Sequence, residues 1–135
     1  MNEIFLQVRG LRTHFVTDEG VVRAVNGVDF SIPKGRTICL VGESGCGKSV
    51  TARSILQIVD APGRIVAGEI LMKREGGTVD LAALDPRGDE IRAIRGKEIA
   101  MIFQEPMSSL SALHTIGAQI TEAIQLHTPM SDEEA

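Results

Sequence analysis

The feature that most constrains this chain is a glycine-rich octapeptide, GESGCGKS at residues 42–49, which fits the pattern G-x-x-x-x-G-K-[ST] at every fixed position. It follows a nearly continuous apolar run at 37–41 and precedes residues with the apolar spacing of a helix. Such a loop wraps a phosphate chain, because glycines let successive N–H groups point inward and the following helix adds its free N–H groups. A buried strand, a phosphate loop and a helix are therefore predicted over residues 37–60.

The individual residues of this loop have defined tasks in holding a nucleoside triphosphate. Lys48 is expected to reach the β- and γ-phosphates, and the Ser49 hydroxyl is expected to bind Mg²⁺. Cys46 lies inside the loop with no histidine near it in the sequence, so we assign it no catalytic part. The alternative is a glycine-rich turn that carries Lys and Ser by chance. The candidate nucleotide-binding residues are Gly42, Glu43, Ser44, Gly45, Cys46, Gly47, Lys48, Ser49 and Val50.

Composition narrows the classes of function. The chain has 135 residues, a formal net charge of −4 and only 3% aromatic residues, with no Trp and no Tyr. Nucleic-acid surfaces are basic and often aromatic, so we expect no nucleic-acid partner. No apolar run approaches the roughly 20 residues that span a bilayer, and residues 1–10 lack a signal-peptide pattern. Two cysteines and three scattered histidines predict a reduced, cytosolic chain without a disulfide framework or a histidine metal site.

Hydrophobic periodicity predicts a sheet followed by helices and a second buried strand. Alternation over 4–8, 21–24 and 28–32 predicts a mostly antiparallel sheet in the opening third of the chain. The runs 65–72 and 78–81 predict a hairpin, and 99–103 (IAMIF) predicts a strand buried on both faces. Helices are predicted from the apolar set Ala52, Ile55, Leu56 and Val59, from Asp85-Pro86 followed by Ile91 and Ile94, and from Ile116, Ile120, Ala123, Ile124 and His127. Ser131 and Glu134 fit a capping box at a further helix start.

Two longer stretches carry a family resemblance. Residues 95–124 (RGKEIAMIFQEPMSSLSALHTIGAQITEAI) resemble the Q-loop region of ABC-type ATPases, and residues 8–51 are similar to the start of the same domain. The likeness is greatest to the ATP-binding subunits of bacterial dipeptide, oligopeptide and nickel importers. It implies an α/β fold, a P-loop NTPase core with an N-terminal antiparallel β subdomain, incomplete at the C-terminus. In this one domain the β region would cover about 1–35 and 64–82, the phosphate-loop strand and helix 37–60, the Q-loop strand 98–104 and the start of a helical subdomain 108–135.

The resemblance also implies roles for single residues. Gln104 matches the glutamine that contacts Mg²⁺ and the attacking water in this family. It would act in catalysis with Lys48 and bind Mg²⁺ with Ser49. Phe15 matches the aromatic residue that stacks on adenine, where the family more often has Tyr. The implied cofactors are ATP and Mg²⁺. The implied partners are a second ATP-binding subunit and membrane permease subunits, so the protein would be cytoplasmic and peripheral to the inner face of the cytoplasmic membrane.

Three motifs of the family do not occur in the residues after Gln104: the LSGGQ-type signature, the apolar run that ends in Asp-Glu, and the switch histidine. In the family, the Glu of that Asp-Glu pair polarises the attacking water. Loss of a general base slows a reaction by about 10²–10⁴-fold, so we expect residues 1–135 to bind MgATP without appreciable hydrolysis. The full-length parent would be an ATPase that energises import of peptides, nickel or another solute. In the family, a strand not found in residues 1–135 pairs beside the phosphate-loop strand, so the resemblance implies an unpaired apolar edge at 37–41 that would make the chain self-associate or leave it only marginally stable. The alternatives are a non-catalytic nucleotide-binding or interaction module and a P-loop kinase.

Overall fold

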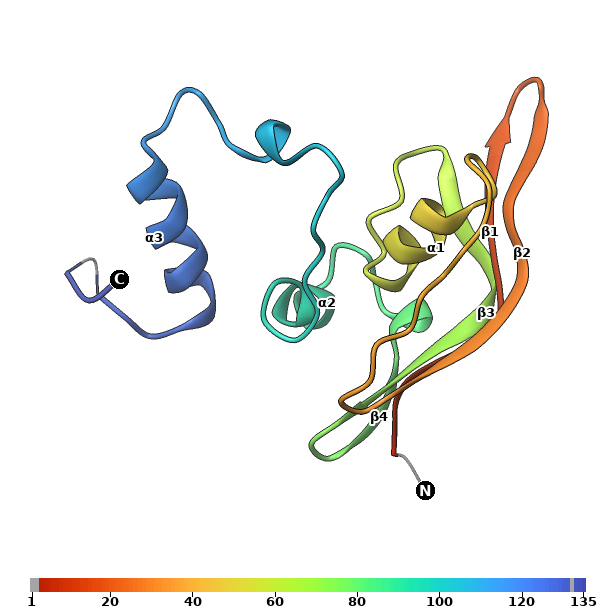
Figure 1. The fold of residues 1–135 in the computed structure, drawn as a ribbon, viewed down its shortest axis with the longest axis horizontal. Helices are drawn as coiled ribbons and strands as arrows, with labels where there is room; N and C mark the ends of the chain where they lie inside the picture. The colour runs from red at the N-terminus through yellow and green to blue at the C-terminus, as the bar shows by residue number, and fades with distance from the viewer. Residues whose placement is uncertain (1–2, 132) are drawn as a thin grey trace. The chain divides into compact units, whose positions relative to one another are not determined.

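A computed structural model of the protein describes residues 3–131 and 133–135. The chain forms two compact units, Met1–Ile91 and Arg92–Ala135. In chain order the elements are β1 (Ile4–Thr17), β2 (Gly20–Pro33), α1 (Lys48–Ile55), β3 (Gly63–Arg74), β4 (Gly77–Asp80), the 3-10 turn η1 (Leu81–Ala83), α2 (Asp89–Ile94), the 3-10 turn η2 (Pro106–Ser109) and α3 (Ile116–His127) (Figure 1).

The first unit is built on an antiparallel sheet with the strand order β2-β1-β3-β4. β1 pairs with β2 on one side and with β3 on the other, and both pairings are antiparallel. The predicted antiparallel sheet and the predicted hairpin are therefore confirmed. The two short strands predicted at 21–24 and 28–32 are parts of one long strand, β2, because the β1–β2 ladder continues through several bulges.

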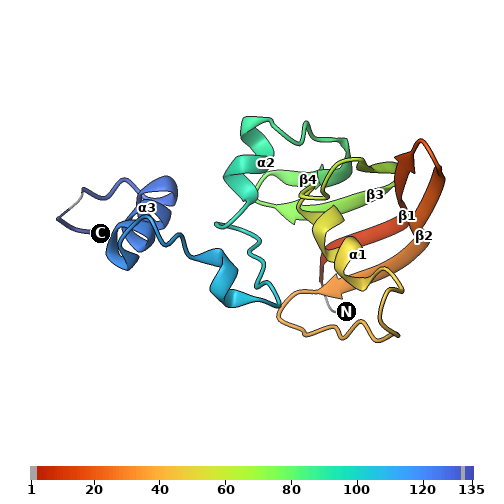
Figure 2. The same cartoon turned by 90° about the horizontal axis from the view of Figure 1, so that it is seen from above.

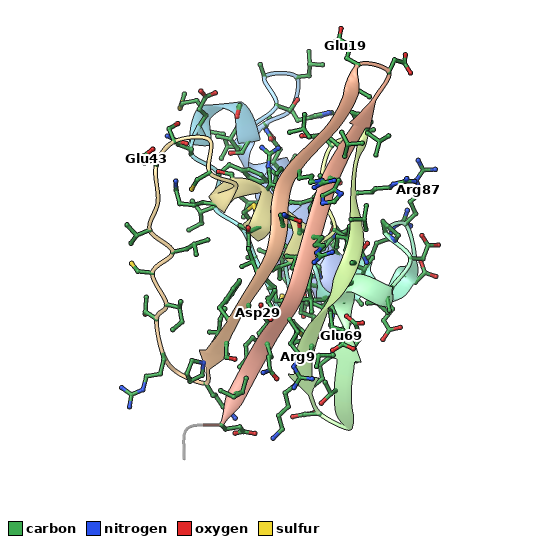
Figure 3. All side chains as sticks on the ribbon, turned by 90° about the vertical axis from the view of Figure 1, so that its right-hand side faces the viewer. Arg9, Glu19, Asp29, Glu43, Glu69 and Arg87 are labelled. Atoms are coloured by element: carbon green, nitrogen blue, oxygen red, sulfur yellow. The ribbon has the colours of Figure 1, made fainter. Side chains whose placement is uncertain are left out.

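The core of this unit lies on the face of the sheet that carries α1 (Figure 2). The apolar residues buried there come from three strands, from the residue after α1 and from η1, and Ile91 of α2 is a further buried residue of this unit: Leu6, Val8, Leu11, Val25, Leu56, Ile70, Met72, Leu81 and Ile91. Burying such side chains contributes about 1.5–3 kcal/mol each. The opposite face is more polar, and Figure 3 shows Arg9 beside Glu69 there, with 3.7 Å between guanidinium and carboxylate. One apolar face and one polar face are typical of an antiparallel sheet.

Helix α1 begins at Lys48, within the last two residues of the glycine-rich octapeptide, but it buries a different face from the one predicted. Thr51 and Ser54 are buried, whereas Ala52 is exposed. The two hydroxyls are tolerated inside because each donates to a carbonyl one turn earlier, Thr51 Oγ1 to Gly47 O at 2.9 Å and Ser54 Oγ to Val50 O at 2.7 Å. The apolar face assigned from periodicity is therefore wrong at Ala52, whereas Ile55 is half-buried and Leu56, just beyond the helix, is buried.

The strand predicted at 37–41 is absent from the structure. These residues have no regular secondary structure and are exposed, Val41 to 89%. A strand apolar on both faces is stable only between neighbouring strands and under covering helices. Among the described residues, the two edges of the sheet are β2 and β4, and neither pairs with this segment. An apolar run thus predicts burial without supplying the surface that buries it.

The Q-loop strand predicted at 98–104, with its apolar run 99–103, is absent for the same reason. Residues 100–103 have no regular secondary structure, and Ile102 is 96% exposed. Within the described residues, the pairing here is one isolated bridge between Arg95 and Ile99. Both predictions of strands buried on two faces are therefore corrected by the structure.

Asp85 caps a turn rather than a helix. Its carboxylate accepts from Arg87 N at 3.0 Å and its carbonyl accepts from Gly88 N at 2.9 Å. The helix that follows, α2, begins only at Asp89. Ile91 and Ile94 are nevertheless fully buried, as their spacing predicts.

The second unit contains α3, a predicted helix that the structure confirms over Ile116–His127. Thr115 caps it by accepting from Ala118 N at 3.2 Å. None of its residues is buried, so its apolar side chains, which were expected to form a helix core, remain largely exposed. The predicted capping pair is present near the chain end, where Ser131 N and Oγ donate to Glu134 Oε2 at 3.0 and 2.8 Å. Asp132, inside that predicted helix start, lies outside the described residues. Across the described residues, no helix is long and apolar enough to cross a membrane.

Candidate phosphate-binding site

The loop at 42–49 is attached to the sheet through Gly47. This residue precedes α1 and has a φ of +96°, a conformation that L side chains rarely adopt. A Cβ at Gly47 would also collide with the Ala24 carbonyl oxygen of β2. Glycine is thus required here for two independent reasons, the backbone conformation and the close approach of β2. The sequence shows the glycine but gives no sign of its partner, Ala24.

The loop also closes on itself. A Cβ on Gly42 would lie 2.6 Å from the Cys46 sulfur, closer than real Cβ contacts. Gly45 has a φ of +80°, and Cys46 N donates to Glu43 O at 3.3 Å. The glycines therefore permit a tight turn whose two ends face each other.

Lys48 places its ammonium group over this turn. Its Nζ donates to the carbonyl oxygens of Gly42 and Glu43 at 2.7 and 2.6 Å, and lies 3.4 Å from the Cys46 sulfur. Helix α1 has no acidic residue in its first turn and no side-chain cap at Gly47. No carboxylate of the first turn therefore opposes the charge of Lys48, and no side chain of the capping residue accepts from the first N–H groups of the helix. Such an arrangement suits a polyphosphate, because anions are stabilised at a helix N-terminus.

The remaining loop residues are open to solvent. Glu43, Ser44 and Ser49 are exposed, and Val50 is half-buried. Figure 3 shows Glu43 on the loop, away from the sheet. The Ser49 hydroxyl is thus free of cover at the start of α1, where a Mg²⁺ ligand would be needed. The residues fit the nucleotide and the metal that the motif predicts.

A buried pair of hydroxyls, which no local sequence pattern predicts, fixes α1 on the sheet. Thr13 of β1 and Ser54 of α1 are both buried, with 2.7 Å between their hydroxyl oxygens. Because Ser54 also donates to Val50 O, both groups keep a partner away from water. The loop and the helix that follows it are therefore held on the sheet at two places, by Gly47 against Ala24 of β2 and by Ser54 against Thr13 of β1.

The other two predicted site residues, Phe15 and Gln104, lie in different units of the chain. Phe15 is half-buried on β1 and pairs with Val22 of β2, two residues before Ala24. Phe15 and Gly47 thus lie at the same end of the β1–β2 ribbon. Gln104 belongs to the second unit, where it is exposed at a bend. Its catalytic and Mg²⁺-binding roles stay predictions.

Comparison with known protein families identifies relatives of this chain. The profile of the ABC transporter family matches residues 25–133, which include the whole phosphate loop and Gln104. The chain belongs to the ABC transporter family. The fold class inferred from the resemblance is confirmed by this match, together with the antiparallel sheet at the N-terminus.

Individual relatives of this ABC transporter chain are similar over almost all of its length. A probable peptide ABC transporter ATP-binding protein of Sinorhizobium fredii is 47% identical over 98% of this chain. The oligopeptide transport ATP-binding protein AppD and the dipeptide transport ATP-binding protein DppD of Bacillus subtilis are 44% and 43% identical, over 96% and 98% of it. The chain spans 38% of the length of each of these three relatives. Membership of this family implies nucleotide binding and disfavours the alternative of a P-loop kinase.

Proposed function

We propose that this chain is the ATP-binding region of an ABC transporter subunit that energises peptide import. The observation that carries the proposal is the phosphate loop: Lys48 lies over a turn made by Gly42, Gly45 and Gly47, at the uncapped start of α1. The names of the relatives support the peptide as cargo. Permease subunits and a second ATP-binding subunit are the partners that such a role requires, at the cytoplasmic side of the membrane.

Each loop residue then has a part in binding MgATP. The N–H groups of the loop and of the first turn of α1 surround the β- and γ-phosphates, and Lys48 neutralises their charge. Ser49 binds Mg²⁺, and Phe15 stacks on adenine. For Gln104, in the second unit, the Mg²⁺-binding role rests only on its match to the family's glutamine. Mg²⁺ neutralises phosphate charge when it is bound. Residues 1–135 lack the family's signature, Asp-Glu and switch-histidine motifs, so we propose that they bind ATP without appreciable hydrolysis.

A calorimetric titration with ATP in the presence of Mg²⁺ tests the binding. Saturable binding is expected, and Lys48→Ala should weaken it about tenfold or more, since charge-assisted contacts to the phosphates are lost. Lys97→Ala is the matched control, because Lys97 is an exposed lysine in a turn of the second unit. A folded sample that does not bind ATP, or a Lys48→Ala variant that binds it unchanged, would overturn the proposal.

The two cysteines give an independent chemical readout. Both are exposed, but only Cys46 lies in the loop, beside Lys48. Bound MgATP should slow the alkylation of Cys46 and leave the alkylation of Cys39 unchanged. Equal Cys46 rates with and without MgATP would place the nucleotide elsewhere. Phosphate release by residues 1–135 above the level of Lys48→Ala would contradict the proposed lack of hydrolysis.

A further inference from the structure

Gly63, the first residue of β3, is glycine for a reason of packing. Its φ lies outside the left-handed range, so backbone conformation does not require glycine. A Cβ at this position would lie 2.5 Å from Val59 Cγ1, and 2.6 and 2.8 Å from Cε1 and Cζ of Phe15. These distances are shorter than real Cβ contacts. The Phe15 ring and the Val59 side chain therefore occupy the space that any side chain at position 63 would need.

The same contacts define where the Phe15 ring lies. Phe15 and Gly63 are cross-strand partners of β1 and β3, and the register between Thr13 and Phe15 is regular on that side. Side chains two residues apart share a face of a strand. Thr13 faces α1, since its hydroxyl lies 2.7 Å from that of Ser54, so Phe15 faces the α1 side as well. There its ring rests on Gly63 next to Val59 and stays half-exposed.

We propose that Gly63 and Val59 form a seat that fixes the Phe15 ring for stacking on the adenine base of ATP. Gly63 is then a positioning residue for nucleotide recognition, acting through Phe15. The inference rests on the proposed function, ATP binding at the phosphate loop. Its geometric support is that Phe15 pairs with Val22 while Gly47 packs on Ala24, two residues further along β2. An aromatic face strengthens base binding only where the ring is held at the right place and angle.

Gly63→Ala tests the seat, because one added methyl group must displace the ring end or Val59. ATP affinity should fall about tenfold, close to the loss expected for Phe15→Ala. Affinity for inorganic triphosphate should not change, since that ligand uses only the phosphate loop. Gly117→Ala is the matched control: it is a glycine outside the left-handed φ range with nothing within 4 Å of the added Cβ.

A double-mutant cycle separates positioning from general damage. In the Phe15→Ala background the ring is gone, so Gly63→Ala should cause little further loss of ATP affinity. If Gly63→Ala does not fold, Val59→Ala tests the same seat without adding atoms, and a roughly threefold loss for ATP alone is expected. Equal losses for ATP and triphosphate, or a full additional loss in the Phe15→Ala background, would overturn the seat. Triphosphate binding with no gain from adenine would also overturn it while leaving the phosphate loop intact, and a folded chain that binds neither ligand would overturn both proposals.

Discussion

Strand β3 (GRIVAGEILMKR) and residues 37–41 (TICLV) are both rich in Ile, Leu and Val, yet only β3 forms a strand. β3 lies between β1 and β4, and it has α1 over one face. Residues 37–41 have no strand beside them among the described residues, and Val41 is 89% exposed. The comparison shows that hydrophobicity decides which residues can be buried, whereas the available neighbours decide whether they are.

The largest expected effect comes from a matched pair of truncations in these two regions. Ile70→Ala in β3 should lower the free energy of unfolding by about 2–5 kcal/mol, because Ile70 is fully buried and leaves a cavity. Val41→Ala should change it by no more than about 0.5 kcal/mol, because the side chain already lies in solvent. Urea unfolding of the two variants measures both values.

An equal loss of unfolding free energy in Val41→Ala and Ile70→Ala would contradict this difference between the two regions. Such a result would mean that 37–41 is buried in solution, by self-association or by pairing with another segment. Sedimentation at two protein concentrations distinguishes these cases, because burial through self-association depends on protein concentration. An exposed apolar segment of this kind is a plain route to self-association.

A smaller effect is expected where α1 is attached to the sheet. Thr13→Val and Ser54→Ala should each lower the free energy of unfolding by about 1 kcal/mol, because each removes one partner of a buried hydroxyl pair. The double variant should lose less than the sum, since the two groups contact each other. Thr78→Val, at an exposed threonine of β4, is the control. Strictly additive losses would show that the 2.7 Å contact between the two hydroxyls does not stabilise the fold.

The sequence was most informative where a local rule sets the structure. The spacing of Gly42, Gly47 and Lys48 predicted the phosphate loop, and the start of α1 followed from it. It was least informative where a distant partner decides. Nothing in the local sequence links Gly47 to Ala24 or Thr13 to Ser54, because those contacts depend on how the long β1–β2 ladder is registered. The predictions for the runs 37–41 and 99–103 failed for the same reason. An apolar run predicts that a strand is buried, but it does not identify the strands and helices that would bury it.

The smallest expected effect is on the pH dependence of stability, and it involves two acidic groups, Glu3 in the first unit and Glu134 in the second. A hydrogen bond from Lys73, together with the charges of Lys73 and Lys34, holds the pKa of Glu3 below its ordinary value of 4.5. Hydrogen bonds from the backbone and hydroxyl of Ser131 lower the pKa of Glu134. A lowered pKa in the folded state gives stability that is present above the ordinary value and is lost as the pH falls through the lowered one.

Of these two groups, Glu3 is the one that contacts the sheet, since its carboxylate lies 2.6 Å from the ammonium group of Lys73 in β3. Glu3→Gln should therefore make the unfolding of the first unit less dependent on pH below the ordinary value of 4.5, whereas Glu134→Gln should leave that dependence unchanged. Thermal midpoints measured from about pH 6 to pH 3 test both. Since the Glu3 side chain is exposed, the ion pairs are screened and the change should be small and should shrink further in salt. If Glu134→Gln altered the pH dependence of unfolding of the sheet, the two units would unfold together. The paired strands of the sheet and the segments without strand neighbours could then not be compared as independent regions.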